Sequence, residues 1–370
     1  MSKRAWTMAA ALGLALAALA ASPGAALASG GRVIRVTSTI QAAVDKARPG
    51  DTVVVPPGVY HESVLITTSH LTLRGSHAAV IDARGFDNGI RVGAGEQRTG
   101  PDGFPRCPKI SVRDVTVDGL TVRNADDNGI FLIGVDGFTV RGGRYLDNHE
   151  YGVFPSCSSN GLIAGNFARG ANDTAFYVGN DTHVTVTGNR ASGNTSAYEV
   201  ENSSFVVERG NQASGNTAGI LVFVLPSLPR TRTSHVLVEH NVYVNNNRPN
   251  PVSPTSGEDI GLVPTGTGVL DVAADDVTIR DNVISGNDTV GVAIITTPFA
   301  GQDPRVEPFP DRARVVGNVI LRNGQHPDLL RSPMGGADVL YDGSGTGNCF
   351  ARNRYATDLP PGVVAAFPCG

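Results

Sequence analysis

Two glutamates at alternate positions of one short segment could carry out proton-transfer chemistry. In the segment 197–201, Tyr198 and Val200 alternate with Glu199 and Glu201, which is the two-residue period of a β-strand. We expect the apolar pair to face a core and both glutamates to face solvent together. Carboxylates placed in this way can serve as general acid, general base or metal ligand.

The same five-residue pattern recurs before and after this segment. Its copies begin at residues 129, 152, 175, 197 and 219, so they lie 22 or 23 residues apart. If the copies stack, one outward column consists of Phe131, Phe154, Tyr177, Glu199 and Leu221, and its neighbour of Ile133, Ser156, Gly179, Glu201 and Phe223. Because aromatic faces suit sugar rings, we predict Tyr177, Glu199 and Glu201 as catalytic residues and Phe131 and Phe154 as substrate contacts. The alternative is a face half covered by loops, with both glutamates in water.

A second set of polar residues precedes these segments. Three acidic residues would form one column at a turn, beside a column of Asp126, His149 and Asn172. Like charges one coil apart repel each other unless a cation or a raised pKa relieves them. Oxygen ligands suit Ca²⁺, so we predict a calcium site at Asp127, Glu150 and Asp173, and His149 joins the catalytic candidates. The alternative is that these side chains splay into water.

Two arginines could bind the carboxylates of acidic sugars. Arg144 and Arg190 align near one turn of the repeat, and we predict them as substrate-binding residues. The alternative is that both are ordinary solvated surface residues.

The repeat itself predicts the fold. A coil of about 22 residues accommodates three short strands and three turns, and stacked coils pair their strands in parallel about 4.8 Å apart. Asparagines that tolerate left-handed turns and bond their copies would form two columns, one of Asn166, Asn189, Asn211, Asn241, Asn282 and Asn318, the other of Asn172, Asn194, Asn216 and Asn287. We predict an all-β, single-stranded right-handed parallel β-helix with three strands per coil. Longer spacings predict loops at 226–233, 246–268 and 296–311.

The first residues resemble a secretory signal. Residues 1–28 combine an early positive charge, an Ala/Leu-rich stretch too short to span a bilayer, and a small-residue cleavage site at 26–28. We predict a secreted, extracytoplasmic protein; the alternative is an uncleaved N-terminal anchor.

The remaining chain divides into a long repeat region and a tail. The β-helix domain would span 29–350, and the tail 351–370. Within the domain, residues 38–48 are expected to form a short helix capped by Ser38, whose apolar face would cover the open first coil.

Charge and composition exclude some function classes. Charged residues make up 17% of the chain and the net charge is −4, so no basic stripe marks a nucleic-acid partner. No membrane association is expected after removal of the signal. The sequence leaves the oligomeric state open.

Four cysteines in an exported chain favour disulfides. Three pairings are possible, and we expect the two that join the nearest partners, Cys107–Cys157 and Cys349–Cys369, the second of which would staple the tail. A zinc site is the alternative, although no pair shows metal-ligand spacing.

Two stretches carry family resemblances. The stretch from Thr39–Val44 to Val80–Asp82 resembles the entry of many pectate-lyase-like β-helix proteins, a group that includes lyases, esterases, epimerases and binding proteins. Segments 151–155, 177–179, 199–203 and 219–226 resemble a family of exported bacterial parallel β-helix repeat proteins with no established activity. The resemblances imply fold and export and leave the reaction open.

A shorter motif resembles a catalytic one. Asp147-Asn148-His149-Glu150 is similar to the Asp-Pro-His-Asp/Glu motif of alginate C5-epimerases, in which that His and Asp belong to the catalytic group. Here the proline is absent, and Arg144 stands at the place of the motif's tyrosine.

Two functions from different classes follow. The first is binding of, or action on, an extracellular polysaccharide, with polyuronate lyase or epimerase chemistry if the protein is an enzyme. The second is a non-catalytic β-helix that serves as an envelope scaffold or binds a partner protein.

Overall fold

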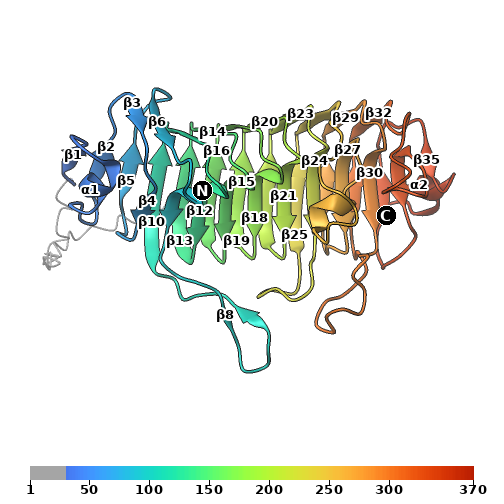
Figure 1. Cartoon of the computed structure of the whole chain (residues 1–370). Coiled ribbons are helices and arrows are strands. Elements are labelled where there is room, and N and C mark those ends of the chain that lie inside the picture. Colours follow the sequence, from blue (N-terminus) through green and yellow to red (C-terminus); the bar gives the residue numbers. More distant parts are fainter. Residues whose placement is uncertain (1–30) are drawn as a thin grey trace, which may run out of the picture. The chain divides into compact units, whose positions relative to one another are not determined.

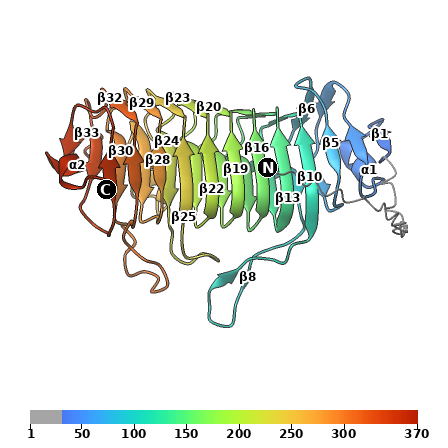
Figure 2. The same cartoon turned by 180° about the vertical axis from the view of Figure 1, so that it is seen from behind.

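The computed structural model describes residues 31–370, which form one compact unit. The predicted signal at 1–28 lies outside the described residues. Three long parallel sheets run the length of this unit, joined only by short turns and by several loops (Figures 1 and 2).

Each sheet is built from strands that are one coil apart in the sequence. Sheet A contains β1 (Val33–Arg35), β2 (Thr52–Val54), β5 (Thr72–Arg74), β10 (Val112–Asp118), β13 (Val135–Arg141), β16 (Ser159–Ala164), β19 (Thr182–Thr187), β22 (Ser204–Arg209), β25 (Ser234–Glu239), β28 (Thr278–Arg280), β31 (Arg314–Val316) and β34 (Cys349–Ala351). Sheet B contains β3 (Gly58–Tyr60), β6 (Ala79–Asp82), β11 (Thr121–Arg123), β14 (Arg144–Leu146), β17 (Phe167–Arg169), β20 (Arg190–Ser192), β23 (Gln212–Ser214), β26 (Val242–Val244), β29 (Val283–Ser285) and β32 (Val319–Leu321). Sheet C contains β4 (Val64–Ile66), β7 (Asn88–Val92), β12 (Asn128–Ile133), β15 (Tyr151–Ser156), β18 (Thr174–Gly179), β21 (Ser196–Glu201), β24 (Ala218–Phe223), β27 (Thr267–Val272), β30 (Val290–Ile295), β33 (Ala337–Tyr341) and β35 (Asp358–Leu359).

The register confirms the predicted parallel β-helix. Phe131 pairs with Phe154, and Tyr177 pairs with Glu199, which pairs with Leu221, so the outward columns predicted from the repeat are correct. Each complete coil of the right-handed β-helix places one strand in each of the three sheets.

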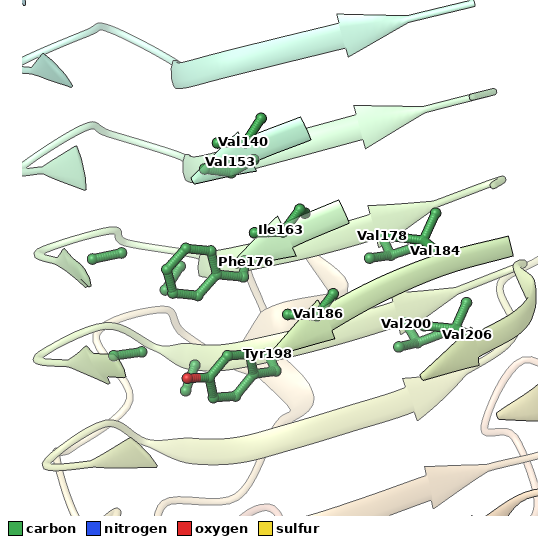
Figure 3. Packing of buried hydrophobic residues seen from close by; sticks show 14 of the residues in the cluster. Val140, Val153, Ile163, Phe176, Val178, Val184, Val186, Tyr198, Val200 and Val206 are labelled. Atoms are coloured by element: carbon green, nitrogen blue, oxygen red, sulfur yellow. The ribbon is translucent and has the colours of Figure 1, made fainter. Parts of the chain in front are cut away.

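The interior of the coils is filled by β-branched residues and a few rings. Figure 3 shows Val178 and Val200 packed in the core, each contributed by a strand of sheet C in successive coils. The rings of Phe176 and Tyr198 stack with centroids 5.6 Å apart. Identical inward positions therefore pack on each other along the stack, which is how a solenoid buries a core without a globular shape.

Asparagine ladders stabilise the turns, with one correction to the prediction. In the first ladder the side-chain oxygen of Asn189 accepts from the backbone amide of Asn166 at 2.9 Å, and later members repeat this bond. The second ladder passes through Ala171 and not Asn172, because Ala171 donates to Asn194 at 3.0 Å. The first-ladder asparagines of the middle coils also do not adopt left-handed geometry, which belongs to the residue before each of them, such as Gly188 with φ +64°.

Five insertions leave the coils, of which three were predicted. Segments 224–233, 245–266 and 296–313 interrupt the repeat as expected, whereas 93–111, which contains the hairpin of β8 (Arg98–Thr99) and β9 (Pro105–Arg106), and 322–336 were not predicted. Figures 1 and 2 show three of the insertions leaving the stack at the same edge.

These edge insertions interlock. The backbone amide of Ser227 donates to Asp303 at 3.0 Å, and the guanidinium of Arg305 lies 3.4 Å from the ring centre of Phe104. Loops from three distant parts of the sequence therefore form one wall along this edge of the coils.

The two ends differ in detail from the prediction. Helix α1 spans Ile40–Val44, shorter than the expected 38–48, and Thr39 rather than Ser38 caps it, accepting from Ala42 at 3.1 Å. Its residues Ile40, Ala43 and Val44 are buried. After the helix, the backbone amide of Arg48 donates to Asp51 at 2.9 Å, in the turn that leads into β2.

The C-terminal residues continue the structure beyond the expected domain boundary. The segment after residue 350 adds β35 and helix α2 (Val363–Ala366), and Phe350 bridges Pro368. Both predicted disulfides, Cys107–Cys157 and Cys349–Cys369, are present. Within residues 31–370, helices are all too short or too polar to cross a bilayer.

Candidate functional site

A cleft of about 700 Å³ lies over the outer face of sheet C. Its floor comes from the start of β15, from the middle of β18 and β21, and from the turns before β15 and β18. Its other wall is the covering loop, residues 246–266, which includes a short 3-10 helix, Asp259–Leu262. The lining residues are His149, Glu150, Tyr151, Asn172, Asp173, Tyr177, Glu199, Phe223, Leu225, Pro251, Val252, Ser253, Ser256, Gly257, Glu258, Asp259 and Ile260.

Strand alternation positions the central side chains as predicted. Because Tyr198 and Val200 point into the core (Figure 3), Glu199 and Glu201 must point out of the coil. They do not face solvent, which corrects the prediction: each is only 3% exposed. The covering loop causes this burial, since Ile260 packs on the outer face of the neighbouring strand.

The two glutamates have different environments. Glu199 lines the cleft, and its carboxyl group contacts a hydroxyl. Glu201 is not among the lining residues, and its Oε1 has no hydrogen-bond partner among the described residues. Burial raises the pKa of Glu201 to about 8, and the nearby charges of Asp259 and Asp173 add to this effect.

A short hydrogen-bonded chain joins two carboxyl groups in the cleft. The Tyr151 hydroxyl donates to Asp173 Oδ2 at 3.1 Å. The Thr174 hydroxyl lies 3.0 Å from Asp173 Oδ1 and 2.5 Å from Glu199 Oε2. A threonine hydroxyl has one proton to donate, so it cannot donate to both carboxyl groups at once. If both contacts are hydrogen bonds, either Asp173 or Glu199 must carry a proton and donate it to Thr174.

The pKa shifts agree with this shared proton. Burial raises the pKa of Asp173 to about 7, with repulsion from Glu150 as a further cause. Burial also raises the pKa of Glu199 well above its ordinary value, and the charge of Asp173 acts in the same direction. The pair can therefore hold one proton near neutral pH, which is the condition for an acid and a base acting together.

Aromatic rings extend from the cleft toward the N-terminal coils. The rings of Tyr151 and Tyr177 lie 4.9 Å apart, Phe154 meets Tyr177 edge-on at 4.5 Å, and Phe131 follows Phe154 at 5.2 Å. Gly179 makes room for them, since a Cβ there would lie 2.4 Å from the Tyr177 ring. Phe131 and Phe154, predicted as substrate contacts, lie next to the cleft rather than inside it.

The predicted acidic column exists at the level of the backbone. The backbone amide of Glu150 donates to the carbonyl of Asp127 at 2.8 Å, and the backbone amide of Asp173 donates to the carbonyl of Glu150 at 3.3 Å. Asp127 is exposed, however, and within residues 31–370 no group of three or more His, Cys, Asp or Glu is placed to hold a metal ion. Calcium binding here stays a prediction.

The remaining candidates lie at the rim or elsewhere. His149 is exposed at the edge of the cleft, with its Nδ1 3.0 Å from Glu150 Oε1. Arg144 and Arg190 belong to sheet B, where both pair with Phe167, and neither lines the cleft. The structure therefore does not bring the two arginines to the predicted catalytic residues.

The comparison with known proteins identifies the fold family. Residues 110–249 and 147–306 match the model of the right-handed β-helix region. The chain belongs to this family. A search of curated protein sequences gives no match to this β-helix.

Several solved structures are similar to this β-helix. The A-module of the mannuronan C-5 epimerase AlgE4 from Azotobacter vinelandii gives a TM-score of 0.61 at 18% identity, covering 88% of this chain and 92% of that one. An alginate lyase from Paenibacillus sp. str. FPU-7 gives 0.51 at 15% identity, covering 89% and 96%. A tailspike protein of the E. coli bacteriophage HK620, in complex with a hexasaccharide, gives 0.56 at 12% identity, covering 86% of this chain and 59% of that one. At these low sequence identities, the similarity shows a shared fold and not a shared activity.

Four residues of the β-helix site were missed from the sequence. Tyr151 and Thr174 flank the predicted columns, and only the hydrogen bonds show their role. Glu258 and Asp259 belong to the covering loop, whose acidic composition was visible but whose position over sheet C was not. Their signal in the sequence was the unusual length of this insertion.

Proposed function

We propose that this β-helix is an extracytoplasmic protein that binds a polysaccharide in the cleft and hydrolyses it with the Asp173–Glu199 pair. The observation that carries the proposal is Thr174, whose single hydroxyl lies within hydrogen-bond distance of two carboxyl groups beside a row of aromatic rings. Two disulfides are compatible with export. Polysaccharide as the ligand is supported by the mannuronan epimerase, alginate lyase and hexasaccharide-bound tailspike that share the fold.

Each residue of the pair has a distinct role in the proposed reaction. Glu199, more strongly desolvated, is the general acid and gives its proton to the glycosidic oxygen as the bond from that oxygen to the anomeric carbon breaks. Asp173 is the nucleophile, because the shared Thr174 hydroxyl holds the two carboxyl groups at the short spacing of about 5–5.5 Å that is typical of double displacement. Its carboxylate oxygen bonds to the anomeric carbon as the glycosidic bond breaks. A water molecule, which gives its proton to the Glu199 carboxylate, then attacks the anomeric carbon and releases Asp173. Glu199 thereby regains its proton from the water, Thr174 holds the two carboxyl groups together, and Tyr151 and Tyr177 support the sugar rings.

The charge of the cleft favours a neutral or amino-sugar polysaccharide. Among the described residues, those lining the cleft include five carboxylates and neither lysine nor arginine: Glu150, Asp173, Glu199, Glu258 and Asp259. A polyuronate would bring further negative charge to this site. Lyase or epimerase chemistry on a uronate also needs a cation or an arginine to stabilise the enolate, and Arg144 and Arg190 lie on another sheet.

The test is a panel of polysaccharides incubated with the purified protein. It should include neutral, amino-sugar and polyuronate chains, with release of reducing ends as the readout. We expect cleavage of a neutral or amino-sugar chain, reduced about 10²–10⁴-fold in Glu199→Gln and in Asp173→Asn. The control is Glu307→Gln, an exposed glutamate remote from the cleft, which should keep full activity.

Other results would decide against this proposal. Unsaturated products from a polyuronate, detected by their ultraviolet absorbance, would indicate lyase chemistry instead. Epimerised uronates without chain cleavage would indicate an epimerase. If no chain on the panel is bound or changed, the protein is a non-catalytic β-helix.

A further inference from the structure

The outward column that carries Glu199 changes its chemistry at that residue. Toward the N-terminal coils its members are Tyr177, Phe154 and Phe131. Toward the C-terminal coils they are Leu221, Leu270, Ala293 and Leu340, each paired with the one before. A ligand lying along this column would meet rings and carboxyl groups on one side of Glu199 and only aliphatic side chains on the other.

A groove of about 450 Å³ lies over the aliphatic half of the column. Its walls are the covering loop and the segments 296–299 and 330–334. The volume falls within the range of about 300–1,000 Å³ that is typical of small-molecule sites. Its floor crosses four strands, which corresponds to a length of about 14 Å at the spacing of parallel strands.

The charged residues at the groove are engaged elsewhere in the protein. The guanidinium of Arg331 binds the carboxylate of Asp328 at 3.0 Å and the carbonyl oxygens of Gly261 and Val252 at 2.8 and 2.9 Å. These bonds fix two walls of the groove to each other. Asp342 accepts from the amide of Thr296 at 2.7 Å. Apart from Glu199 and Asp259 at the end nearest the cleft, the remaining lining is mostly apolar: aliphatic side chains and prolines, two phenylalanines, and a few threonine and serine residues.

The groove and the cleft are continuous. Both are lined by Glu199, Phe223, Leu225, Asp259 and Ile260. At the rim of the groove, Leu330 is 72% exposed, and Leu262 and Met334 are also exposed. Aliphatic side chains left in water around an apolar hollow mark a binding site.

We infer that the groove binds the aliphatic chain of an acylated or alkylated saccharide, whose sugar part lies in the adjoining cleft. The assignment of the sugar part rests on the proposed function, whereas the assignment of the chain rests on the groove. The ligand is therefore amphipathic, with its polar and apolar parts joined near Glu199.

The probes are n-alkyl β-glucosides of increasing chain length, titrated calorimetrically below their critical micelle concentrations. We expect affinity to rise about fourfold per added methylene and to level off once the chain fills the floor of the groove. Methyl β-glucoside should bind far more weakly than the octyl compound.

A matched pair of surface variants locates the site. Leu330→Ser removes a rim residue and should weaken binding of octyl β-glucoside severalfold. Leu329→Ser changes its neighbour, which is 62% exposed but does not line the groove, and should leave binding unchanged. Ala293→Phe, which fills the floor, should abolish the dependence on chain length.

The inference and the proposed function fail in different ways. Affinity that does not depend on chain length, or equal losses in both leucine variants, would overturn the inference even if polysaccharide is cleaved. Chain-length-dependent binding without cleavage of any polysaccharide would overturn the proposed hydrolase and leave the groove assignment standing. Binding to phosphatidylcholine vesicles without binding of the monomeric glucosides would assign the groove to a lipid surface and contradict the inference.

Discussion

Glu199 and Glu201 are two positions apart on one strand, yet the covering loop gives them different chemistry. Glu199 reaches the hydroxyl of Thr174 and lines the cleft, so its proton can be exchanged with a ligand. Glu201 is equally buried but its Oε1 has no partner among residues 31–370. A buried carboxyl group without a partner is a cost to folding unless it stays protonated.

This cost predicts a pH dependence of stability. The folded-state pKa of Glu201 is raised to about 8, above its value in the unfolded chain. Between about pH 4.3 and that raised value the unfolded state releases a proton that the folded state retains, so this residue makes stability fall as the pH rises. We expect Glu201→Gln to raise the melting temperature at pH 8 by several degrees, at about 2–4 °C per kcal/mol, and to change it little at pH 4.

The control for this experiment is Glu307→Gln, which replaces an exposed carboxylate. It should show the same melting temperature as the parent protein at both pH values. Equal melting temperatures for Glu201→Gln and the parent at pH 8 would contradict the argument.

Among the structural elements, the asparagine ladders show how a turn is held in every coil. Asn189 accepts from the amide and the side chain of Asn166 and donates to the carbonyl of Ile163, all within buried surroundings. Asn166 and Asn189 are almost fully buried, so each polar group depends on its partner in the next coil.

Removal of one ladder residue should therefore be costly. We expect Asn189→Ala to lower the free energy of unfolding by roughly 1–3 kcal/mol for each polar group left without a partner. Asn172→Ala is the matched control, because Asn172 is exposed and lies outside the ladder. Denaturant titration of both variants measures the difference, and similar losses in the two would show that the ladder is not the stabilising element.

The elements also show which parts of the site the sequence could predict. The period of 22 or 23 residues was sufficient to place Tyr177, Glu199 and Leu221 in one column, because parallel stacking repeats every position. The same period misplaced Asn172 by one residue, since the turn after β17 is one residue longer than the next. The repeat period also did not predict which loop covers which strand, because the inserted residues do not follow the repeat and so have no predicted position.

As a whole molecule, a solenoid loses stability locally rather than globally. Each coil contacts only its neighbours, so a change at one end is not transmitted through a common core. The Cys349–Cys369 bridge joins residues 20 apart and ties the last strand of sheet A to the tail. The Cys107–Cys157 bridge ties the base of the first edge insertion to β15 and the turn after it.

This locality predicts the effect of removing the terminal bridge. Replacement of Cys349 and Cys369 by serine should speed amide hydrogen exchange in β34, β35 and α2 and leave exchange in β12–β21 unchanged. A loop of about 15 residues contributes roughly 3 kcal/mol when closed by a disulfide, so the local effect should be large. Faster exchange throughout sheet C would contradict the expectation that each coil depends only on its neighbouring coils.

The sequence by itself determined the architecture, because a β-helix repeats one local rule. Alternation fixed which residues point inward, the repeat length fixed the columns, and the cysteine positions allowed the two disulfides. The tertiary structure decided the chemistry of the site. The covering loop arrives from between β26 and β27 and buries Glu199 and Glu201, and burial sets their pKa values. A repeat pattern cannot predict the path of a loop that leaves it. That path depends on contacts with residues far from the loop in the sequence, such as the bond from Arg331 to the carbonyl of Gly261 and the packing of Ile260 with Leu221.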